Sequence, residues 1–207
     1  MNTPYRILVA EDHTLVRMGI VSLLETERGL SVVGEADDGK AAVRLTLSLK
    51  PDVVIMDLMM PLMDGIQATG EIRRQLPDTK ILILTTSTSS DDISSALRNG
   101  AQGAITKNAP YSELIAAIRD ILAGKTSVSE EISHILSADP PVPNLSPRQA
   151  EVLNLIAKGL TNPDIARILR ISLYTVKEQV NGIFLKLGAT NRAEAVTIAL
   201  RKHLLKI

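Results

Sequence analysis

The chain has 207 residues, of which 45% are hydrophobic and 22% charged, so it has enough apolar material for one large or two smaller folded domains. No apolar run approaches the roughly 20 residues of a membrane span, and charges stand where a signal peptide would be apolar, so we expect neither a membrane span nor an export signal. The formal net charge is zero and Cys is absent, which excludes disulfides and thiolate metal sites and fits a cytoplasmic location.

Short apolar runs alternate with helix-length amphipathic segments through residues 1–123. Runs such as VVIM and ILIL are apolar at consecutive positions, so both faces of these strands should be covered. The pattern predicts an α/β doubly wound fold, a parallel sheet with helices on both sides, for which we take the strand order 2-1-3-4-5. The expected strands are 5–10, 30–36, 52–57, 79–86 and 103–107, and the expected helices are 13–26, 39–49, 65–75, 90–98 and 110–122.

This alternation stops after Gly124. Residues 124–143 contain one possible short helix and then the sequence DPPVP, whose prolines cannot donate backbone hydrogen bonds. We therefore expect a stiff linker over 124–143 between a first domain, 1–123, and a second domain, 144–207.

The second domain has only helical signals. Ser146, Pro147 and Gln149 form a helix start with a capping box, and Gly159 ends that helix. Further starts at Thr161, Ser172 and Asn191 predict an all-α domain of four helices. Two short helices joined by a tight turn, the second carrying Lys177, predict a helix-turn-helix.

The two predicted domains differ in charge. Residues 1–123 hold 12 Lys and Arg against 16 Asp and Glu, net −4, whereas residues 144–207 hold 10 against 4, net +6. A basic second domain is what a polyanionic partner requires, although surface charge alone can produce the same division.

Polar residues follow the predicted strands at the points where they end. Glu11 and Asp12 follow the first strand, Asp57 ends the third, Thr85 the fourth and Lys107 the fifth. The carboxyl ends of parallel strands meet at one edge of the sheet, where ligands bind. Three acids in one place repel one another, and oxygen ligands without His or Cys favour Mg²⁺. A carboxylate beside a metal, a Lys and a Thr is a suitable phosphoryl acceptor, and Asp57 has the central position.

These motifs resemble a known family over nearly the whole chain. EDH at 11–13, VVIMDLMMPLMDG around Asp57, LTT at 84–86 and GAITK ending at Lys107 are similar to the receiver domain of bacterial two-component response regulators, which has a flavodoxin-like fold. Residues 145–196 resemble the LuxR-type helix-turn-helix. The order and spacing of both parts match the NarL/FixJ class.

The resemblance implies a transcriptional regulator, not an enzyme, that accepts a phosphoryl group from a sensor histidine kinase on Asp57. Glu11, Asp12, Asp57 and the backbone carbonyl of Met59 would bind Mg²⁺, and Thr85 and Lys107 would contact the phosphoryl group. In the second domain, Lys177, Glu178 and Asn181 would face the major groove of double-stranded DNA. Lys186 and Arg192 would contact DNA phosphates, and the helix over 191–204 would form a homodimer on activation.

One departure from the family bears on function. The family places an aromatic switch residue three positions before the Lys of the fifth strand, whereas this chain has Ala104. The alternative is therefore a receiver that is never phosphorylated and serves as a protein-interaction module, with DNA binding constitutive or controlled by a partner. An aspartyl-phosphate hydrolase is disfavoured, because such enzymes carry a second Asp two residues after the nucleophile, where this chain has Met59.

Overall fold

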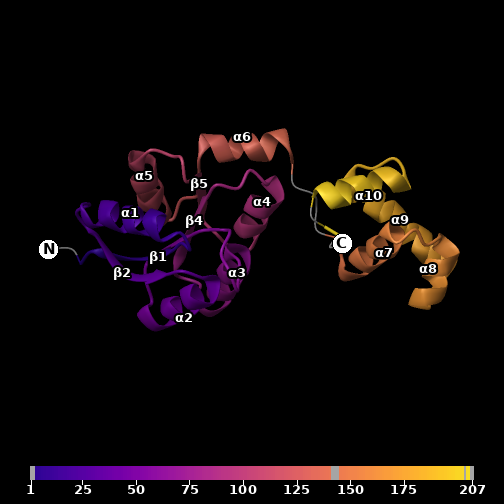
Figure 1. Ribbon diagram of the computed structural model, residues 1–207, viewed down its shortest axis with the longest axis horizontal. Coiled ribbons are helices and arrows are strands. Elements are labelled where there is room, and N and C mark those ends of the chain that lie inside the picture. Colours follow the sequence, from indigo (N-terminus) through magenta and orange to yellow (C-terminus); the bar gives the residue numbers. More distant parts are fainter. Residues whose placement is uncertain (1–2, 141–144, 203, 206–207) are drawn as a thin grey trace. The chain divides into compact units, whose positions relative to one another are not determined.

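A computed structural model of the chain describes residues 3–140, 145–202 and 204–205, and the chain divides into two compact units, Met1–Pro140 and Pro141–Ile207. The first unit is a parallel sheet covered by helices, and the second is entirely helical (Figure 1). Within the described part of the chain, no helix is both long and apolar enough to cross a membrane.

The sheet of the first unit has the order β2-β1-β3-β4-β5-β6, with every neighbouring pair parallel. The predicted order of the first five strands is confirmed, and β6 extends the sheet beyond β5. The strands are β1 (Tyr5–Ala10), β2 (Leu30–Ala36), β3 (Val53–Met56), β4 (Lys80–Thr85), β5 (Gly103–Thr106) and β6 (Ser127–Val128).

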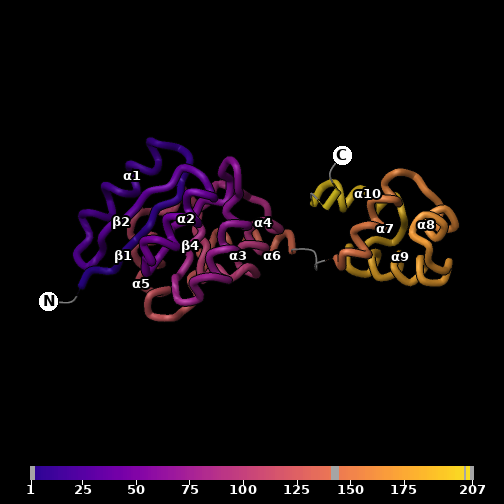
Figure 2. The backbone as a smooth tube through the Cα atoms, turned by 90° about the horizontal axis from the view of Figure 1, so that it is seen from below, coloured from indigo at the N-terminus to yellow at the C-terminus, as the bar shows by residue number. Residues whose placement is uncertain are grey.

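Helices cover both faces of this sheet (Figure 1), and Figure 2 shows the same backbone from below. Successive residues of each strand point to opposite faces, so Val54 and Met56 of β3 belong to one hydrophobic core and Val53 and Ile55 to the other. The first core lies under α2 (Gly39–Leu49), α3 (Gly65–Gln75) and α4 (Ser90–Arg98), and the second under α1 (Thr14–Glu25) and α5 (Tyr111–Leu122).

The expected linker over 124–143 is wrong for residues 127–138. These residues form β6, which pairs with β5, and α6 (Glu130–Ala138), whose Ile132 is fully buried in the same core as Ala104. Ser129 caps α6 by accepting a hydrogen bond from the Ile132 amide at 3.2 Å. Ile132 gains the burial of its side chain only by packing on the sheet, so the segment belongs to the first unit.

The second unit contains the four predicted helices, α7 (Pro147–Ala157), α8 (Asn162–Leu169), α9 (Leu173–Leu187) and α10 (Arg192–Arg201). The predicted capping box of α7 is present, because Ser146 and Gln149 exchange hydrogen bonds. The predicted last helix, 191–204, ends earlier, at Arg201, and residue 203 lies outside the described residues.

A short turn joins α8 to α9. Arg170 ends α8 in the left-handed conformation, with φ of 53°, and Ser172 then begins α9 by accepting a hydrogen bond from the Thr175 amide. Arg148 of α7 donates to the carbonyl of Leu169 at 3.1 Å, which fixes the end of α8. Three helices thus hold the turn in one geometry.

Candidate functional site

Asp57 directly follows β3, at the carboxyl end of a strand that lies between β1 and β4 in the sheet. Its amide donates to the carbonyl of Ala10 at the end of β1 over 2.9 Å, which ties the ends of the two strands together. The residue is only 2% exposed. The strand therefore presents a nearly buried carboxylate at the edge of the sheet, where the sequence predicted it.

Lys107 brings two acids together at this edge. Its ammonium Nζ lies 2.8 Å from Asp57 Oδ2 and 2.6 Å from Glu11 Oε2. The Lys107 amide also donates to the carbonyl of Thr85 over 2.9 Å, which links the ends of β5 and β4. The predicted residues of β1, β3 and β5 thus meet through a single positive charge.

Burial and charge act in opposite directions on this group. Burial raises the pKa of the Asp57 carboxyl above its ordinary value, and Glu11 adds to this, while Lys107 and the Met59 amide counteract it. Burial alone would lower the pKa of Lys107, but the hydrogen bond to Asp57 and the negative charges of Asp57 and Glu11 raise it above its ordinary value. Lys107 therefore keeps its positive charge at neutral pH.

Asp12 joins the cluster from the side of α1. Single donor atoms of Glu11, Asp12 and His13 lie within 4.8 Å of one another. His13 Nδ1 lies 2.7 Å from Asp12 Oδ1, so His13 is a neighbour of the site that the sequence did not single out. Its position beside Asp12 at the start of α1 was the available signal.

The carboxylate of Glu11 has oxygen lone pairs that remain available to bind a metal ion. It is 1% exposed, and its Oε2 atom is buried without a hydrogen bond of good geometry, although it forms the ion pair with Lys107. A close ion pair satisfies the charge of a carboxylate but leaves lone pairs unused. A buried oxygen donor of this kind, which lies near a ligand atom of Asp12 and shares Lys107 with Asp57, fits a hard divalent cation such as Mg²⁺.

The loop after Asp57 is held close to it. The Met59 amide lowers the pKa of the Asp57 carboxyl, and the Gly65 amide donates to the carbonyl of Leu58 at 2.9 Å. A Cβ atom on Gly65 would lie 2.0 Å from the carbonyl oxygen of Asp57. Only glycine allows the start of α3 to approach the acceptor residue so closely.

Thr85 is fully buried at the end of β4, and its hydroxyl accepts a hydrogen bond from the Ser87 amide at 2.9 Å. Ala104 of β5 is also fully buried and shares a core with Ile132 of α6. Thr106, next to Lys107, donates from its hydroxyl to Glu131 of α6 at 2.7 Å. Helix α6 therefore covers β5 where the family would place its aromatic residue.

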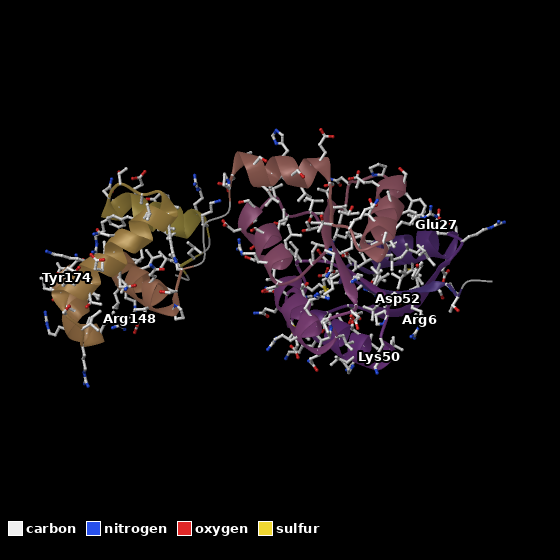
Figure 3. All side chains as sticks on the ribbon, turned by 180° about the vertical axis from the view of Figure 1, so that it is seen from behind. Arg6, Glu27, Lys50, Asp52, Arg148 and Tyr174 are labelled. Atoms are coloured by element: carbon white, nitrogen blue, oxygen red, sulfur yellow. The ribbon has the colours of Figure 1, made fainter. Side chains whose placement is uncertain are left out.

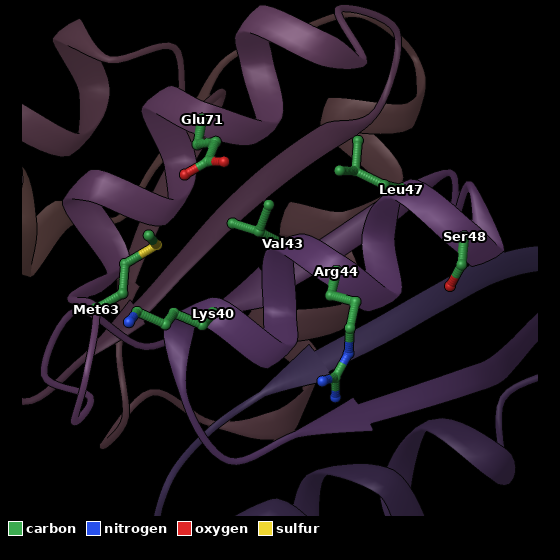
Figure 4. Close-up of a pocket in the computed structure, with 7 residues that line it drawn as sticks. All are labelled: Lys40, Val43, Arg44, Leu47, Ser48, Met63 and Glu71. Carbon is green, nitrogen blue, oxygen red and sulfur yellow. The ribbon is translucent and has the colours of Figure 1, made fainter.

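A groove of ≈ 630 Å³ lies elsewhere on the first unit, between α2 and α3 (Figure 4). It is lined by the apolar side chains of Val43, Leu47 and Met63 and by the charged side chains of Lys40, Arg44 and Glu71, with Ser48 at one end. None of the acids around Lys107 lines it, so it is separate from the site described above.

The second unit presents the predicted polar residues on one face of α9. Lys177, Glu178 and Asn181 are exposed, and their side chains make no hydrogen bond or ion pair with any residue that the structure describes. Residues three or four positions apart are neighbours on the surface of a helix, so Asn181 lies beside both Lys177 and Glu178. These three side chains are thus available to an external partner.

Lys186 and Arg192 differ from those three because both are held by partners inside the unit. Lys186 donates to Gln149 Oε1 at 2.8 Å, which joins α9 to the start of α7. The Arg192 guanidinium donates to the carbonyl of Ile156 in the last turn of α7 and to that of Leu160, which follows the helix, and burial lowers its pKa. Arg192 is therefore part of the packing of the helices.

Two family models match the chain. Residues 7–119 match the response regulator receiver domain, and residues 143–199 match the luxR family of bacterial regulatory proteins. The first match spans the strands that carry the buried acids, and the second spans α7, α8 and α9.

Curated proteins and solved structures resemble the whole chain. The transcriptional regulatory protein LiaR of Bacillus subtilis (strain 168) is 37% identical, covering 96% of this chain and 98% of LiaR. The oxygen regulatory protein NreC of Staphylococcus haemolyticus (strain JCSC1435) is 39% identical, with coverage of 97% and 99%. RcsB from Salmonella enterica serovar Typhimurium, solved on a promoter with the phosphomimetic BeF3⁻, is 31% identical with a TM-score of 0.68, covering 95% of this chain and 98% of RcsB.

Proposed function

Because this chain belongs to the two-component response regulators that join a receiver domain to a LuxR-type DNA-binding domain, and so is a phosphorylation-controlled transcriptional regulator, we propose that Asp57 is its phosphoacceptor. The observation that supports this most directly is the position of Lys107, whose ammonium contacts both Asp57 and Glu11. The donor would be the phosphohistidine of a sensor histidine kinase.

The reaction is the transfer of one phosphoryl group. A carboxylate oxygen of Asp57 attacks phosphorus, the nitrogen–phosphorus bond of the donor breaks, and an acyl phosphate forms on Asp57. Lys107, which stays charged at neutral pH, would move its contact from the carboxylate to a phosphoryl oxygen. Thr85 would offer its hydroxyl to another of these oxygens from the end of β4.

Glu11, Asp12 and Asp57, with the carbonyl of Met59, are the residues that would hold Mg²⁺. The three acids against the single charge of Lys107 leave two negative charges when all are ionised, which one divalent cation balances. When bound, the ion would neutralise negative charge on the phosphoryl group.

In the second unit, Lys177, Glu178 and Asn181 are the residues that would read double-stranded DNA. They are exposed on one face of α9, the second helix of the helix-turn-helix, which is the helix that enters the major groove in this motif. Glu178 would accept a hydrogen bond from a cytosine amino group. Two chains would bind as a homodimer to two half-sites, with α10 as the contact between them.

The test combines phosphorylation with DNA binding. Radiolabel from a phosphorylated histidine kinase, or from a small acyl-phosphate donor, should enter the wild-type chain and not Asp57→Ala. Beryllofluoride with Mg²⁺ should change the affinity of the wild type for DNA and its oligomeric mass. Equal labelling of both chains would remove Asp57 as the acceptor.

An unchanged DNA affinity with beryllofluoride would instead support the alternative, a receiver that serves as a protein-interaction module. Buried Ala104 at the usual aromatic position is the observation that favours this second function.

A further inference from the structure

Helix α9 carries an exposed aromatic residue on the same face as its polar residues. Tyr174 is 73% exposed, and it stands three positions before Lys177 and seven before Asn181, a spacing that places all three on one side of the helix. We propose that the ring of Tyr174 reads a thymine methyl group in the major groove, an inference that rests on the DNA-binding function proposed above.

The fold itself gives Tyr174 no role. The other aromatic residue of α9, Phe184, packs against the core of the second unit, and the hydroxyl of Tyr111 donates to the carbonyl of Leu23 at 2.7 Å. The hydroxyl of Tyr174, in contrast, has no hydrogen-bond partner among the residues that the structure describes. Tyr is also a weaker helix former than Ala, so the residue does not serve the helix either.

The position of Tyr174 suits contact with bases. It is the second residue of α9, after the cap at Ser172, and Figure 3 marks it on the second unit. In the helix-turn-helix motif, residues at the N-terminal end of the second helix are those that contact base edges. Tyr174 therefore lies at the part of α9 where recognition takes place.

The chemistry of the groove selects the partner. Lys177, Glu178 and Asn181 can hydrogen-bond to guanine, cytosine and adenine respectively, but an aromatic ring needs an apolar surface. The C5-methyl group of thymine is the apolar group that base edges present in the major groove. Burying the exposed ring of Tyr174 against this methyl group would also stabilise the complex with DNA through the hydrophobic effect.

The charges of this face support readout of bases over simple attraction to phosphates. Lys177 and Glu178 are neighbours of opposite sign, so together they add no net charge to the face. A contact that depends on a methyl group distinguishes thymine from the other bases without any charge. We thus expect Tyr174 to contribute to the sequence specificity of the protein.

The experiment uses the full chain with beryllofluoride and Mg²⁺. Duplexes are selected from a randomised DNA pool by the wild type, and the best duplex is then remade with deoxyuridine at each thymine in turn, which removes one methyl group. At one thymine the wild type should lose about tenfold in affinity, and Tyr174→Ala should show the same loss on the unmodified duplex. For Tyr174→Ala, deoxyuridine at that thymine should cause no further loss.

Two variants test the specificity of this result. Tyr174→Phe keeps the ring and should bind within about twofold of the wild type, since the proposed contact is apolar. Tyr5→Ala, at a 49% exposed tyrosine of the first unit, is the matched control and should not change the selected sequence. The melting midpoint of Tyr174→Ala should equal that of the wild type, because the side chain is exposed.

The inference is overturned if Tyr174→Ala selects and binds the same duplex as tightly as the wild type, or if Tyr174→Phe loses as much affinity as Tyr174→Ala. Failure of the wild type to enrich any sequence would overturn the proposed DNA-binding function together with this inference. Loss at every thymine alike, independent of Tyr174, would show that the methyl groups act without it.

Discussion

The ammonium of Lys107 lies 2.8 Å from the carboxylate of Asp57, a residue that is only 2% exposed. The same ammonium lies 2.6 Å from Glu11, so one positive charge serves two buried acids. Removing that charge should therefore disturb the site more than the loss of any surface ion pair of the chain.

We predict that Lys107→Met lowers the free energy of unfolding of the first unit by about 3–5 kcal/mol, because two buried acids lose their counter-charge. The matched control is Lys125→Met, which removes an exposed pair with Asp120 and should cost less than about 1 kcal/mol. Urea denaturation followed by circular dichroism measures both.

Mg²⁺ should stabilise Lys107→Met more than the wild type, since the cation then supplies the missing positive charge. Melting curves recorded with Mg²⁺ and with a chelator give the two differences. An equal effect of Mg²⁺ on both chains would speak against a metal site beside Lys107.

Asp57 should make the stability of the first unit depend on pH. Its pKa is raised in the folded state, mainly by burial, so folding favours the protonated carboxyl. Its contribution to stability is therefore present at low pH and lost as the pH rises through the raised pKa. In a chelator, Asp57→Asn should melt at a higher temperature than the wild type at pH 7, and this advantage should shrink towards pH 4.

Asp120→Asn is the control for that experiment, because it removes one negative charge from an exposed ion pair. If Asp57→Asn gained the same amount at pH 4 as at pH 7, the burial of Asp57 would not be the cause of its effect.

Much of this site could be predicted from the order of residues along the chain. Glu11, Asp57, Thr85 and Lys107 each follow an apolar run, and the parallel topology brings the ends of such runs together. The sharing of Lys107 between two acids could not be predicted, because it depends on the direction of side chains from strands about 50 residues apart or more.

Two basic residues of the second unit show that local spacing predicts exposure but not contacts between distant residues. The exposure of Lys177 could be predicted from the spacing of polar and apolar residues along α9 alone. Arg192 has its partners in the last turn of α7 and just after that helix, over 30 residues earlier, and no local pattern marks such a contact. Tyr174 was missed although its spacing from Lys177 and Asn181 was available in the sequence.

We predict that Arg192→Ala destabilises the second unit, by about 1–3 kcal/mol, because carbonyls at the end of α7 lose their donor. Lys177→Ala should leave stability within about 0.5 kcal/mol of the wild type but weaken DNA binding, because its contact with a guanine edge is lost. Calorimetry and binding titrations at several salt concentrations separate the two effects.

For Arg192, the outcome that would contradict the prediction is an effect on DNA binding without an effect on stability. An Arg192→Ala chain with unchanged stability and a reduced salt slope would restore the phosphate contact that the family resemblance implies, and would contradict a packing role.

Glycine at position 65 should be required for the site. A Cβ atom there would lie 2.0 Å from the carbonyl oxygen of Asp57, so Gly65→Ala must shift α3 or the loop, at a cost of about 1–3 kcal/mol. It should also slow the labelling of Asp57. Gly19→Ala is the matched control within α1, where a Cβ meets no atom within 4 Å, and it should stabilise the protein by up to about 1 kcal/mol. The same sign for both substitutions would contradict this account.

Helix α6 should contribute to the stability of the first unit. Ile132 is fully buried with Ala104, so Ile132→Ala should lower the free energy of unfolding by about 2–5 kcal/mol. Ser133→Ala, at the next and exposed position, should change it by less than about 0.5 kcal/mol. Similar small effects of both would mean that α6 is not packed on the sheet in solution.

The attachment of β6 and α6 to the sheet also determines where this regulator can be divided and recombined. A receiver cut after residue 123 would leave β5 as an unpaired edge and expose the apolar surface that Ile132 covers. A hybrid regulator that joins this receiver to a different output domain should therefore be fused after Ala138, so that the receiver keeps its whole hydrophobic core.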